Sequence, residues 1–367
     1  MSEIRVSAPD LDEADIAAVG AVLRSGMLAA GPMVAELEAA LCDTTGAAHA
    51  VAVSSGTSAL HCAMNALAVA PGTEIVSTPF TFVGTVNPAL MCGARLRFVD
   101  IDLDGFGPDL DQLHEAITDR TAAVVVVDLY GQPVAADGVA AAVGGRVPVV
   151  EDACQALGAA HRDRPAGNLF DVGCFSFYAT KNVMSGEGGA LVTDDAEIAA
   201  SARRFRQHGM TGPYEYAELG YNYRMTDVLA ALAVRQMARL ETITRARQSK
   251  AATLNAGLAG LPGLVLPAAP DGVSHAWHQY VVRVTDDFAC DRDTLAKHLA
   301  ANDIRSAVYY PKSLPAYPHV AAATDGPTAF PNSERAAREV LALPVHPKLS
   351  AEDLERVVTV IRDIAGG

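Results

Sequence analysis

Short apolar runs rich in β-branched residues alternate with helical runs between residues 49 and 210. The runs predicted as strands are HAVAVSS, EIVSTP, RLRFVDID, AAVVVVDLYG and VPVVEDA, and they are separated by segments such as TSALHCAMNAL and PDLDQLHEAI. The strand runs lack a clean alternation of polar and apolar residues, which is typical of strands buried on both faces of a sheet. The repeated order of strand, turn and helix therefore predicts an α/β fold in which helices cover a mostly parallel sheet.

Two further strand runs, DVGCFSFYA and GALVTDD, follow without a helix between them, and a glycine-rich turn joins them. The sheet is therefore expected to be mixed rather than purely parallel. After these strands, AEIAASARRFRQHG predicts a helix, LGYNYRMTD an ordered loop, and residues 227–258 a long helical stretch.

A domain boundary is predicted where the helical pattern breaks at AGLPGLVLPAAPDG, residues 259–272. Residues 1–258 would form a large α/β domain that includes the N-terminal segment. Residues 259–367 would form a smaller α+β domain built from AWHQYVVRV, a helix near residues 292–302, the segment IRSAVYYP and a final amphipathic helix from Ser350.

Composition and charge exclude several classes of protein. Of the 367 residues, 50% are hydrophobic and 19% are charged, which indicates a folded globular protein. The net charge of -15 argues against nucleic acid as a partner. The N-terminus lacks the pattern of a signal peptide, and no apolar run reaches the length of a membrane span, so a cytoplasmic location is expected. The six cysteines show no metal-ligand spacing, so we expect reduced thiols and no metal site.

One lysine stands apart from the other basic residues. Lysine and arginine total 28, but only five are lysines, and Lys181 is the only lysine in the first 249 residues. It lies in SFYATKNVMSGEGGALV, between two predicted strands. An arginine keeps its charge, whereas a buried lysine can lose its proton and act as an amine nucleophile. For a single lysine, a chance surface position is the simpler interpretation, and a use of the amine itself is a hypothesis that the other residues have to support.

Other residues with useful chemistry lie where predicted strands end, which is where open α/β sheets bind ligands. SSGTSAL, residues 54–60, follows a strand and precedes a helix, so its backbone N–H groups and hydroxyls could hold a phosphate. Asp152 ends another apolar strand, and Ser176 lies five residues before Lys181. Each feature also has a simpler interpretation, such as a helix cap formed by Ser55 or Thr57, or a turn carboxylate.

The order of these features matches the needs of pyridoxal phosphate. This cofactor needs an amine to hold it, an acid beside its pyridine nitrogen and an anchor for its phosphate. Phe82, in TPFTFVGT, could stack on the pyridine ring, although an ordinary core position is the simpler interpretation for this side chain.

The chain resembles the DegT/DnrJ/EryC1/StrS family of sugar aminotransferases, which have the aspartate-aminotransferase type of fold. The resemblance covers nearly the whole chain. It rests on segments such as VAVSSGTSAL, VVEDACQALGA, FSFYATKNVMSGEGGALVT, LGYNYRMTD and HAWHQYVVRV. This family fold is the fold type I of pyridoxal-phosphate enzymes, with a smaller C-terminal α+β domain beside the large sheet.

The resemblance implies a role for each matching residue. Lys181 would bind the cofactor and carry the proton, Asp152 would pair with the pyridine nitrogen, and Gln155 would lie beside the phenolic oxygen. The phosphate would be bound by Gly56, Thr57 and Ser176, and Phe82 would stack on the ring. Asn222 of the neighbouring subunit would also reach the phosphate. The residues on the substrate side would be Arg224, His208 and Tyr309.

The resemblance also implies an activity and an assembly. The chain would be a homodimer with shared active sites that moves an amino group from an amino acid, expected to be L-glutamate, to a keto sugar linked to UDP or dTDP. Relatives that replace the lysine by histidine are dehydratases, so Lys181 favours transamination. The segment YYPKSLPAYPH departs from the Pro-Leu-His element of many relatives, so the contacts of that histidine are not transferred to this chain.

Two other classes of enzyme do not fit the sequence. A nicotinamide dehydrogenase would need GxGxxG between a strand and a helix, whereas SGEGGAL leads into a strand, and no GxSxG elbow of a serine hydrolase is present. Two alternatives stay open from the sequence: an aminotransferase for a cyclitol or another cyclic ketone without a nucleotide, and a non-catalytic regulatory protein that binds pyridoxal phosphate.

Overall fold

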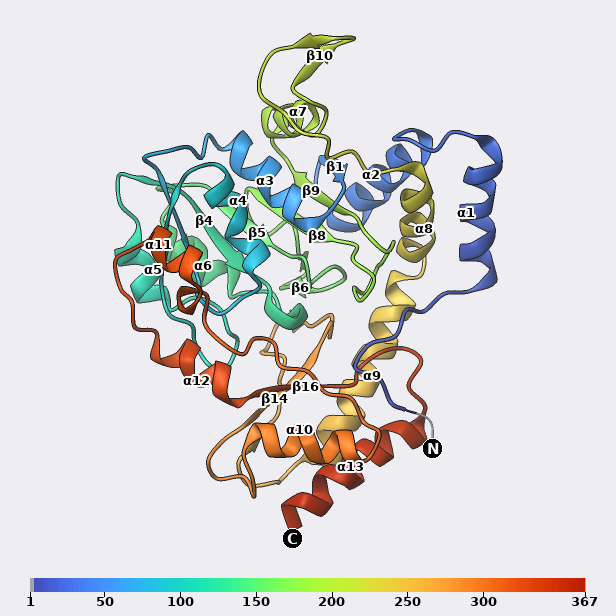
Figure 1. Cartoon of the computed structure of the whole chain (residues 1–367), viewed down its shortest axis with the longest axis vertical. Coiled ribbons are helices and arrows are strands. Elements are labelled where there is room, and N and C mark those ends of the chain that lie inside the picture. Colours follow the sequence, from blue (N-terminus) through green and yellow to red (C-terminus); the bar gives the residue numbers. More distant parts are fainter. Residues whose placement is uncertain (1–2, 367) are drawn as a thin grey trace.

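An eight-stranded sheet forms the centre of the molecule in the computed structural model, which describes residues 3–366 (Figure 1). Its strands, in spatial order, are β1 (His49–Val53), β9 (Gly189–Thr193), β8 (Val172–Ser176), β5 (Val149–Asp152), β4 (Thr121–Val127), β2 (Glu74–Ser77), β3 (Arg95–Phe98) and β15 (Thr324–Asp325). Strand β9 runs antiparallel to both of its neighbours, and the other pairings are parallel. The prediction of a mostly parallel mixed sheet is therefore confirmed.

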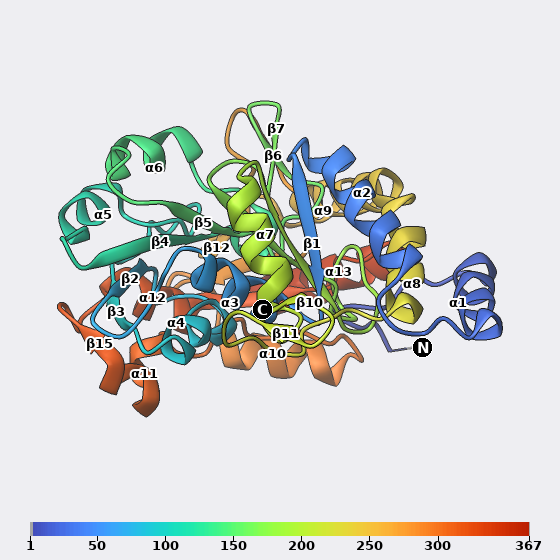
Figure 2. The same ribbon diagram turned by 90° about the horizontal axis from the view of Figure 1, so that it is seen from above.

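Helices cover both faces of this sheet, as Figure 2 shows. One face packs against α3 (Gly56–Ala66), α4 (Asn87–Met91) and α7 (Ala196–Phe205), and the other against α5 (Leu110–Ala116), α6 (Ala136–Val143), α2 (Pro32–Thr45) and α8 (Asp227–Met237). Strand β4 shows why its sequence is continuously apolar: Val125 lies in the core on one face, and Val124 and Val126 lie in the core on the other.

A second, three-stranded antiparallel sheet lies below the large sheet in Figure 1. It consists of β12 (Leu264–Val265), β14 (Tyr280–Val284) and β16 (Val340–Leu343), and it packs with α9 (Leu240–Leu258), α10 (Arg292–Ala301) and α13 (Ala351–Gly366). The predicted boundary at residue 258 coincides with the end of α9. Ala251 and Leu254 of α9 already belong to the core of this smaller sheet. The division into two domains stays a prediction.

The long helical stretch predicted at residues 227–258 consists of two helices, α8 and α9, separated at Ala238 and Arg239. The Arg239 guanidinium forms ion pairs with Asp10 and Asp15, which lie before and within α1 (Glu13–Ser25). The break therefore lies where the N-terminal segment is attached.

The remaining elements are short. The β10–β11 hairpin (Met210–Gly212 and Glu215–Tyr216) projects from the top of the view in Figure 1. The others are β6 (Ala160–His161), β7 (Arg164–Pro165), β13 (Val273–Ser274), α11 (Pro318–Ala323), α12 (Pro331–Glu339) and the 3-10 turns η1 (Val83–Thr85), η2 (Leu129–Gly131) and η3 (Leu314–Ala316). No helix within residues 3–366 has both the length and the apolar character needed to cross a membrane.

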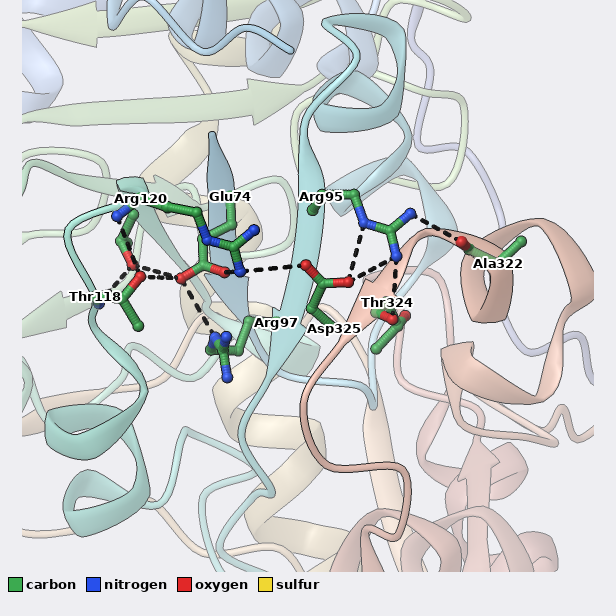
Figure 3. A network of polar contacts seen from close by, with 9 residues as sticks. Glu74, Arg95, Arg97, Thr118, Arg120, Ala322, Thr324 and Asp325 are labelled. Atoms are coloured by element: carbon green, nitrogen blue, oxygen red, sulfur yellow. Dashed lines mark hydrogen bonds and ion pairs between the residues drawn. The ribbon is translucent and has the colours of Figure 1, made fainter. Parts of the chain in front are cut away.

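A polar network joins β15 to the amino ends of the central strands (Figure 3). Glu74, which is fully buried at the start of β2, pairs with Arg120 at 3.1 Å and with Arg97 at 3.3 Å. Arg120 also pairs with Asp325 at 3.3 Å, and Asp325 pairs with Arg95 at 2.7 Å. The network therefore attaches a late segment of the chain to the edge of the large sheet.

Candidate active site

A cavity of about 470 Å³ opens at the carboxyl ends of β1, β5 and β8. The predicted site residues that line it are Gly56, Thr57, Phe82, Asp152, Gln155, Ser176, Lys181 and Tyr309. These residues come from strand ends, the start of α3 and loops that lie far apart in the sequence. Parallel strands bring them together because their carboxyl ends meet at one edge of the sheet.

Lys181 lies in a compact loop between β8 and β9. The loop is closed by hydrogen bonds from Phe177 N to Gly188 O at 2.8 Å and from Ala179 N to Gly186 O at 3.0 Å. Asn182 adds a hydrogen bond from its side chain to Ala276 O at 2.8 Å, and Phe177 is buried in the core beneath. The glycine-rich turn thus holds the lysine rigidly at the cavity.

The electrostatic surroundings of Lys181 favour a reactive amine. Burial lowers the pKa of the Lys181 ammonium, and the nearby Cys154 and Asp152 oppose this shift. Burial raises the pKa of the Cys154 thiol well above its ordinary value, with Asp152 adding to the effect, so Cys154 is neutral at physiological pH. Asp152 is therefore the negative charge that faces the lysine.

Asp152 ends β5 and is 6% exposed. Its Oδ2 accepts a hydrogen bond from Thr85 Oγ1 at 2.7 Å, and its Oδ1 accepts one from Cys154 N at 3.3 Å. Hydrogen bonds to both oxygens therefore hold the side chain in place. The contact with Cys154 N, two residues on, is that of a turn carboxylate, so the simpler interpretation holds locally, and the same side chain also lines the cavity.

The N-terminus of α3 forms a cradle beside β8. Ser55 is the N-cap, and its Oγ accepts from Ser58 N at 3.1 Å, so the capping interpretation is confirmed for Ser55 and wrong for Thr57. The N–H groups of Gly56 and Thr57 lie in the first helical turn, where a helix offers donors to an anion. A Cβ at Gly56 would lie 2.7 Å from Cys154 Sγ and 2.9 Å from Ser176 Cβ, so only glycine allows this close approach.

Aromatic side chains surround the mouth of the cavity. Phe82 is 55% exposed, so the simpler interpretation of Phe82 as an ordinary core residue is wrong. Its ring lies 6.2 Å from that of Tyr310, and Tyr178 is also exposed. Gln155 is held behind them, since its Oε1 accepts from Tyr130 N at 2.7 Å and its Nε2 donates to Tyr310 Oη at 3.3 Å.

These groups fit pyridoxal phosphate. Backbone donors at Gly56 and Thr57 with the Ser176 hydroxyl suit a phosphate, the Asp152 carboxylate suits a protonated ring nitrogen, and Lys181 supplies the amine. Lys181 is the only lysine or arginine that lines the cavity within the described residues. No group of His, Cys, Asp and Glu side chains in residues 3–366 is arranged to hold a metal ion.

The structure does not bring Asn222, Arg224 and His208 into this cavity. The segment around Asn222 runs beside the end of β1, where Ser54 N donates to Tyr223 O at 2.8 Å, and the Asn222 side chain is exposed. His208 lies at the base of the projecting hairpin. The roles predicted for these three residues stay predictions.

The cavity residues that were not identified from the sequence as parts of the site include Thr85, Tyr310 and His278. His278 is 7% exposed, and burial lowers the pKa of its imidazole well below the ordinary value, with Lys181 adding to the effect, so His278 is neutral. For Thr85 and Tyr310, the sequence offered one signal that could have identified them, which is their closeness to predicted site residues. Thr85 follows Phe82 closely, and Tyr310 follows Tyr309.

Comparison with protein families finds one model that matches nearly the whole chain. The model of the DegT/DnrJ/EryC1/StrS aminotransferase family matches residues 9–362.

Relatives with named activities match over almost their full lengths. The chain is 35% identical to the UDP-N-acetyl-3-dehydro-alpha-D-glucosamine 3-aminotransferase of Acidithiobacillus ferrooxidans, over 99% of this chain and 96% of that protein. It is 34% identical to the UDP-4-amino-4-deoxy-L-arabinose–oxoglutarate aminotransferase of Shewanella sediminis, over 98% of this chain and 97% of that protein.

Solved structures show the same architecture. The sugar aminotransferase Spr1654 of Streptococcus pneumoniae in its PLP form aligns with a TM-score of 0.93 at 29% identity, over 99% of each chain. DesI in the presence of its TDP-sugar product aligns with a TM-score of 0.92 at 30% identity, over 100% of this chain and 93% of that chain.

Proposed function

The chain belongs to the DegT/DnrJ/EryC1/StrS aminotransferase family, and we propose that it moves an amino group from L-glutamate to the keto carbon of a nucleotide-linked sugar. The coarser activity follows from the named relatives: the protein is a pyridoxal-phosphate-dependent sugar aminotransferase. The donor and the nucleotide are the parts that we propose.

The observation that carries the proposal is the shared cavity of Lys181 and Asp152. The lysine amine has a lowered pKa, and the aspartate is a buried carboxylate with hydrogen bonds to both oxygens. A buried amine with a lowered pKa, in the same cavity as a buried carboxylate, is the pair that transamination requires.

Bound pyridoxal phosphate would supply a ring that accepts the electron pair when the Cα–H bond of the amino acid breaks. Asp152 would keep the ring nitrogen protonated, because a buried carboxylate stabilises a neighbouring positive charge. Lys181 Nζ would accept the Cα proton and deliver it to the adjacent carbon, since its lowered pKa leaves part of the amine uncharged.

The proposed substrate is supported by the two nucleotide classes in the relatives' names, UDP and TDP. L-glutamate is supported by the oxoglutarate in the name of the Shewanella sediminis relative, because oxoglutarate is the keto acid that glutamate leaves behind. In this chain, the exposed rings of Phe82 and Tyr178 at the cavity mouth offer flat surfaces to a ligand that extends beyond the cavity.

We also propose a homodimer with shared sites. Ile16, Leu23 and Met27, in and just after α1, are 55–60% exposed, and Tyr214 and Leu219 near the hairpin are 85% and 77% exposed. Apolar side chains gathered in this way mark surfaces that pair with another protein. Asn222, exposed near the hairpin, would then reach the phosphate in the partner's cavity.

The absorbance spectrum with pyridoxal phosphate tests the first half of the reaction. The protein is expected to show a visible band from the lysine-bound cofactor, and L-glutamate is expected to convert it to the band of the aminated cofactor. Lys181→Ala removes the amine, so the visible band and at least about ten-thousandfold of the activity should be lost. Lys297→Ala, an exposed lysine on α10, is the matched control and should behave as the wild type.

The acceptor is tested with keto sugars linked to UDP and dTDP and with a cyclitol ketone. Turnover of a nucleotide-linked sugar, with competition by free UDP or dTDP, is the expected result. Turnover of the cyclitol without nucleotide competition would replace the proposed substrate. A visible band without turnover of any ketone would favour the regulatory alternative.

A further inference from the structure

Two buried threonines stand behind Asp152, and neither has a part in the function proposed above. Thr85 is 1% exposed and Thr81 is 2% exposed, and both line the inner wall of the cavity. Thr85 Oγ1 lies 2.7 Å from Asp152 Oδ2, and Thr81 Oγ1 lies 2.9 Å from Thr85 Oγ1. The three side chains form one hydrogen-bonded row.

We propose that Thr85, oriented by Thr81, is a positioning residue that sets the rotation of the Asp152 carboxylate toward the cofactor ring. The proposal rests on the function proposed above, because it concerns the same carboxylate. Thr81 and Thr85 act only through Asp152 and need not touch the cofactor themselves.

The chemistry of a hydroxyl determines which group donates in each hydrogen bond of the row. A carboxylate can only accept, so the single proton of the Thr85 hydroxyl is donated to Asp152. The hydroxyl contact with Thr81 must then run the other way, with Thr81 donating and Thr85 accepting. Thr81 therefore fixes the rotation of the Thr85 hydroxyl, and the polarised hydroxyl is a stronger donor to the carboxylate.

The row limits how Asp152 can move. The torsion that turns a carboxylate about its last bond is soft, so without partners the Asp152 oxygens would be free to rotate. Thr85 holds Oδ2 at 2.7 Å, and Cys154 N holds Oδ1 at 3.3 Å. The carboxylate plane is set by these two contacts, which leaves the second lone pair of each oxygen for a ligand.

The same turn places the stacking ring. Phe82 immediately precedes η1, and Thr85 N donates to Phe82 O at 3.0 Å, which closes the turn. A Cβ at Gly84 would lie 2.8 Å from the Phe82 ring, so glycine is required for the ring to fold back over the turn. One short segment thus orients both the Phe82 ring, which would stack on the cofactor, and the Asp152 carboxylate, which would pair with its ring nitrogen.

Thr85→Val tests the proposal, because valine keeps the shape of threonine and removes the donor. The apoprotein is titrated with pyridoxal phosphate, and the visible circular dichroism per bound cofactor is measured, since this signal reports how uniformly the cofactor is oriented. Thr85→Val is expected to weaken cofactor binding about tenfold to a hundredfold, the range for a lost hydrogen bond to a charged group, and to reduce the dichroism. Thr85→Ser keeps a hydroxyl and should restore both within about threefold.

Thr81→Val supplies a second test that leaves the contact with Asp152 intact. It should weaken binding in the same direction but less, about threefold to tenfold. If Thr85→Val does not fold, the cofactor affinity and the dichroism of Thr81→Val test the proposal in its place.

A merely structural role predicts a different result. The melting temperature of the apoprotein would then fall in the valine variants, while the cofactor affinity and the dichroism of the folded protein would stay at wild-type values, and this outcome overturns the proposal. Unchanged values in all variants overturn it as well. If the wild type itself shows no visible band with pyridoxal phosphate, the proposed function fails first, and the role of Thr85 fails with it.

Discussion

Asp128 and Glu151 are two carboxyl side chains with no exposed surface, at the ends of neighbouring strands behind the active site. Burial raises the pKa of Glu151, but hydrogen bonds that it accepts from Gly167 N at 2.6 Å and Leu169 N at 3.1 Å oppose this rise. Asp128 Oδ1 accepts from Val134 N at 3.0 Å, but its Oδ2 has no donor within the described residues. Burial, together with the charge of Glu151, raises the pKa of Asp128 well above its ordinary value. Asp128 is therefore the carboxyl that carries the proton.

Asp128→Asn is expected to fold and to be more stable than the wild type above the ordinary pKa of the aspartate, 3.8. The folded wild type binds this proton more tightly than the unfolded chain does, so its stability falls as the pH rises from 3.8 toward the raised pKa. The asparagine amide donates to Glu151 without needing a proton. The difference in melting temperature between variant and wild type should therefore grow between about pH 5 and pH 8. A difference that does not vary with pH would contradict the assignment.

At the scale of elements, the network around Glu74 is the main polar attachment of β15 to the large sheet (Figure 3). Burial alone would raise the pKa of Glu74, but the hydrogen bonds from Thr118 and Thr121 and the charge of Arg97 outweigh it and lower the pKa. The folded structure therefore stabilises the charged form of the buried Glu74. The Asp325 side chain, at the outer end of the network, is 28% exposed.

Glu74→Gln is expected to lower the free energy of unfolding by about 2 kcal/mol, because it leaves buried donors with a weaker acceptor. Asp325→Asn, the matched change at the exposed end, should cost less than about 1 kcal/mol. Urea unfolding checks both values. Cofactor binding should be unchanged in both variants, since the network lies at the amino ends of the strands, away from the cavity. Equal losses in the two variants would show that burial does not set the strength of these contacts.

At the scale of the whole molecule, the proposed shared site makes a prediction about mixed dimers. Asn222 is exposed and does not line the cavity of its own subunit, although the adjacent backbone lies beside β1. If Asn222 serves the partner's cavity, its loss damages the neighbouring site rather than its own.

Lys181→Ala and Asn222→Ala proteins should each be impaired alone and regain activity when they are mixed and allowed to exchange subunits. In a mixed dimer, the cavity of the Asn222→Ala subunit keeps Lys181 and receives an intact Asn222 from the partner. At most about half of the sites in such dimers would be restored. The activity of the mixture is compared with that of each parent. No gain on mixing, with subunit exchange verified, would place Asn222 in its own subunit's site.

The sequence by itself determined the fold class and the main chemistry of the cavity. Apolar runs separated by helices require a covered, mostly parallel sheet, and residues at the ends of such strands meet at one edge. This reasoning, together with the resemblance, identified Lys181, Asp152, Ser176 and Phe82, which do line one cavity.

Only the tertiary structure decided which side chains support those residues. Thr85 and Asp152 are 67 residues apart, and Asp128 meets Glu151 because β4 pairs with β5. A hydrogen bond between side chains depends on strand order, register and rotamer to within a fraction of an ångström, whereas the pattern of apolar residues depends only on which faces are buried. The local sequence encodes that pattern, and the packed fold determines the contacts.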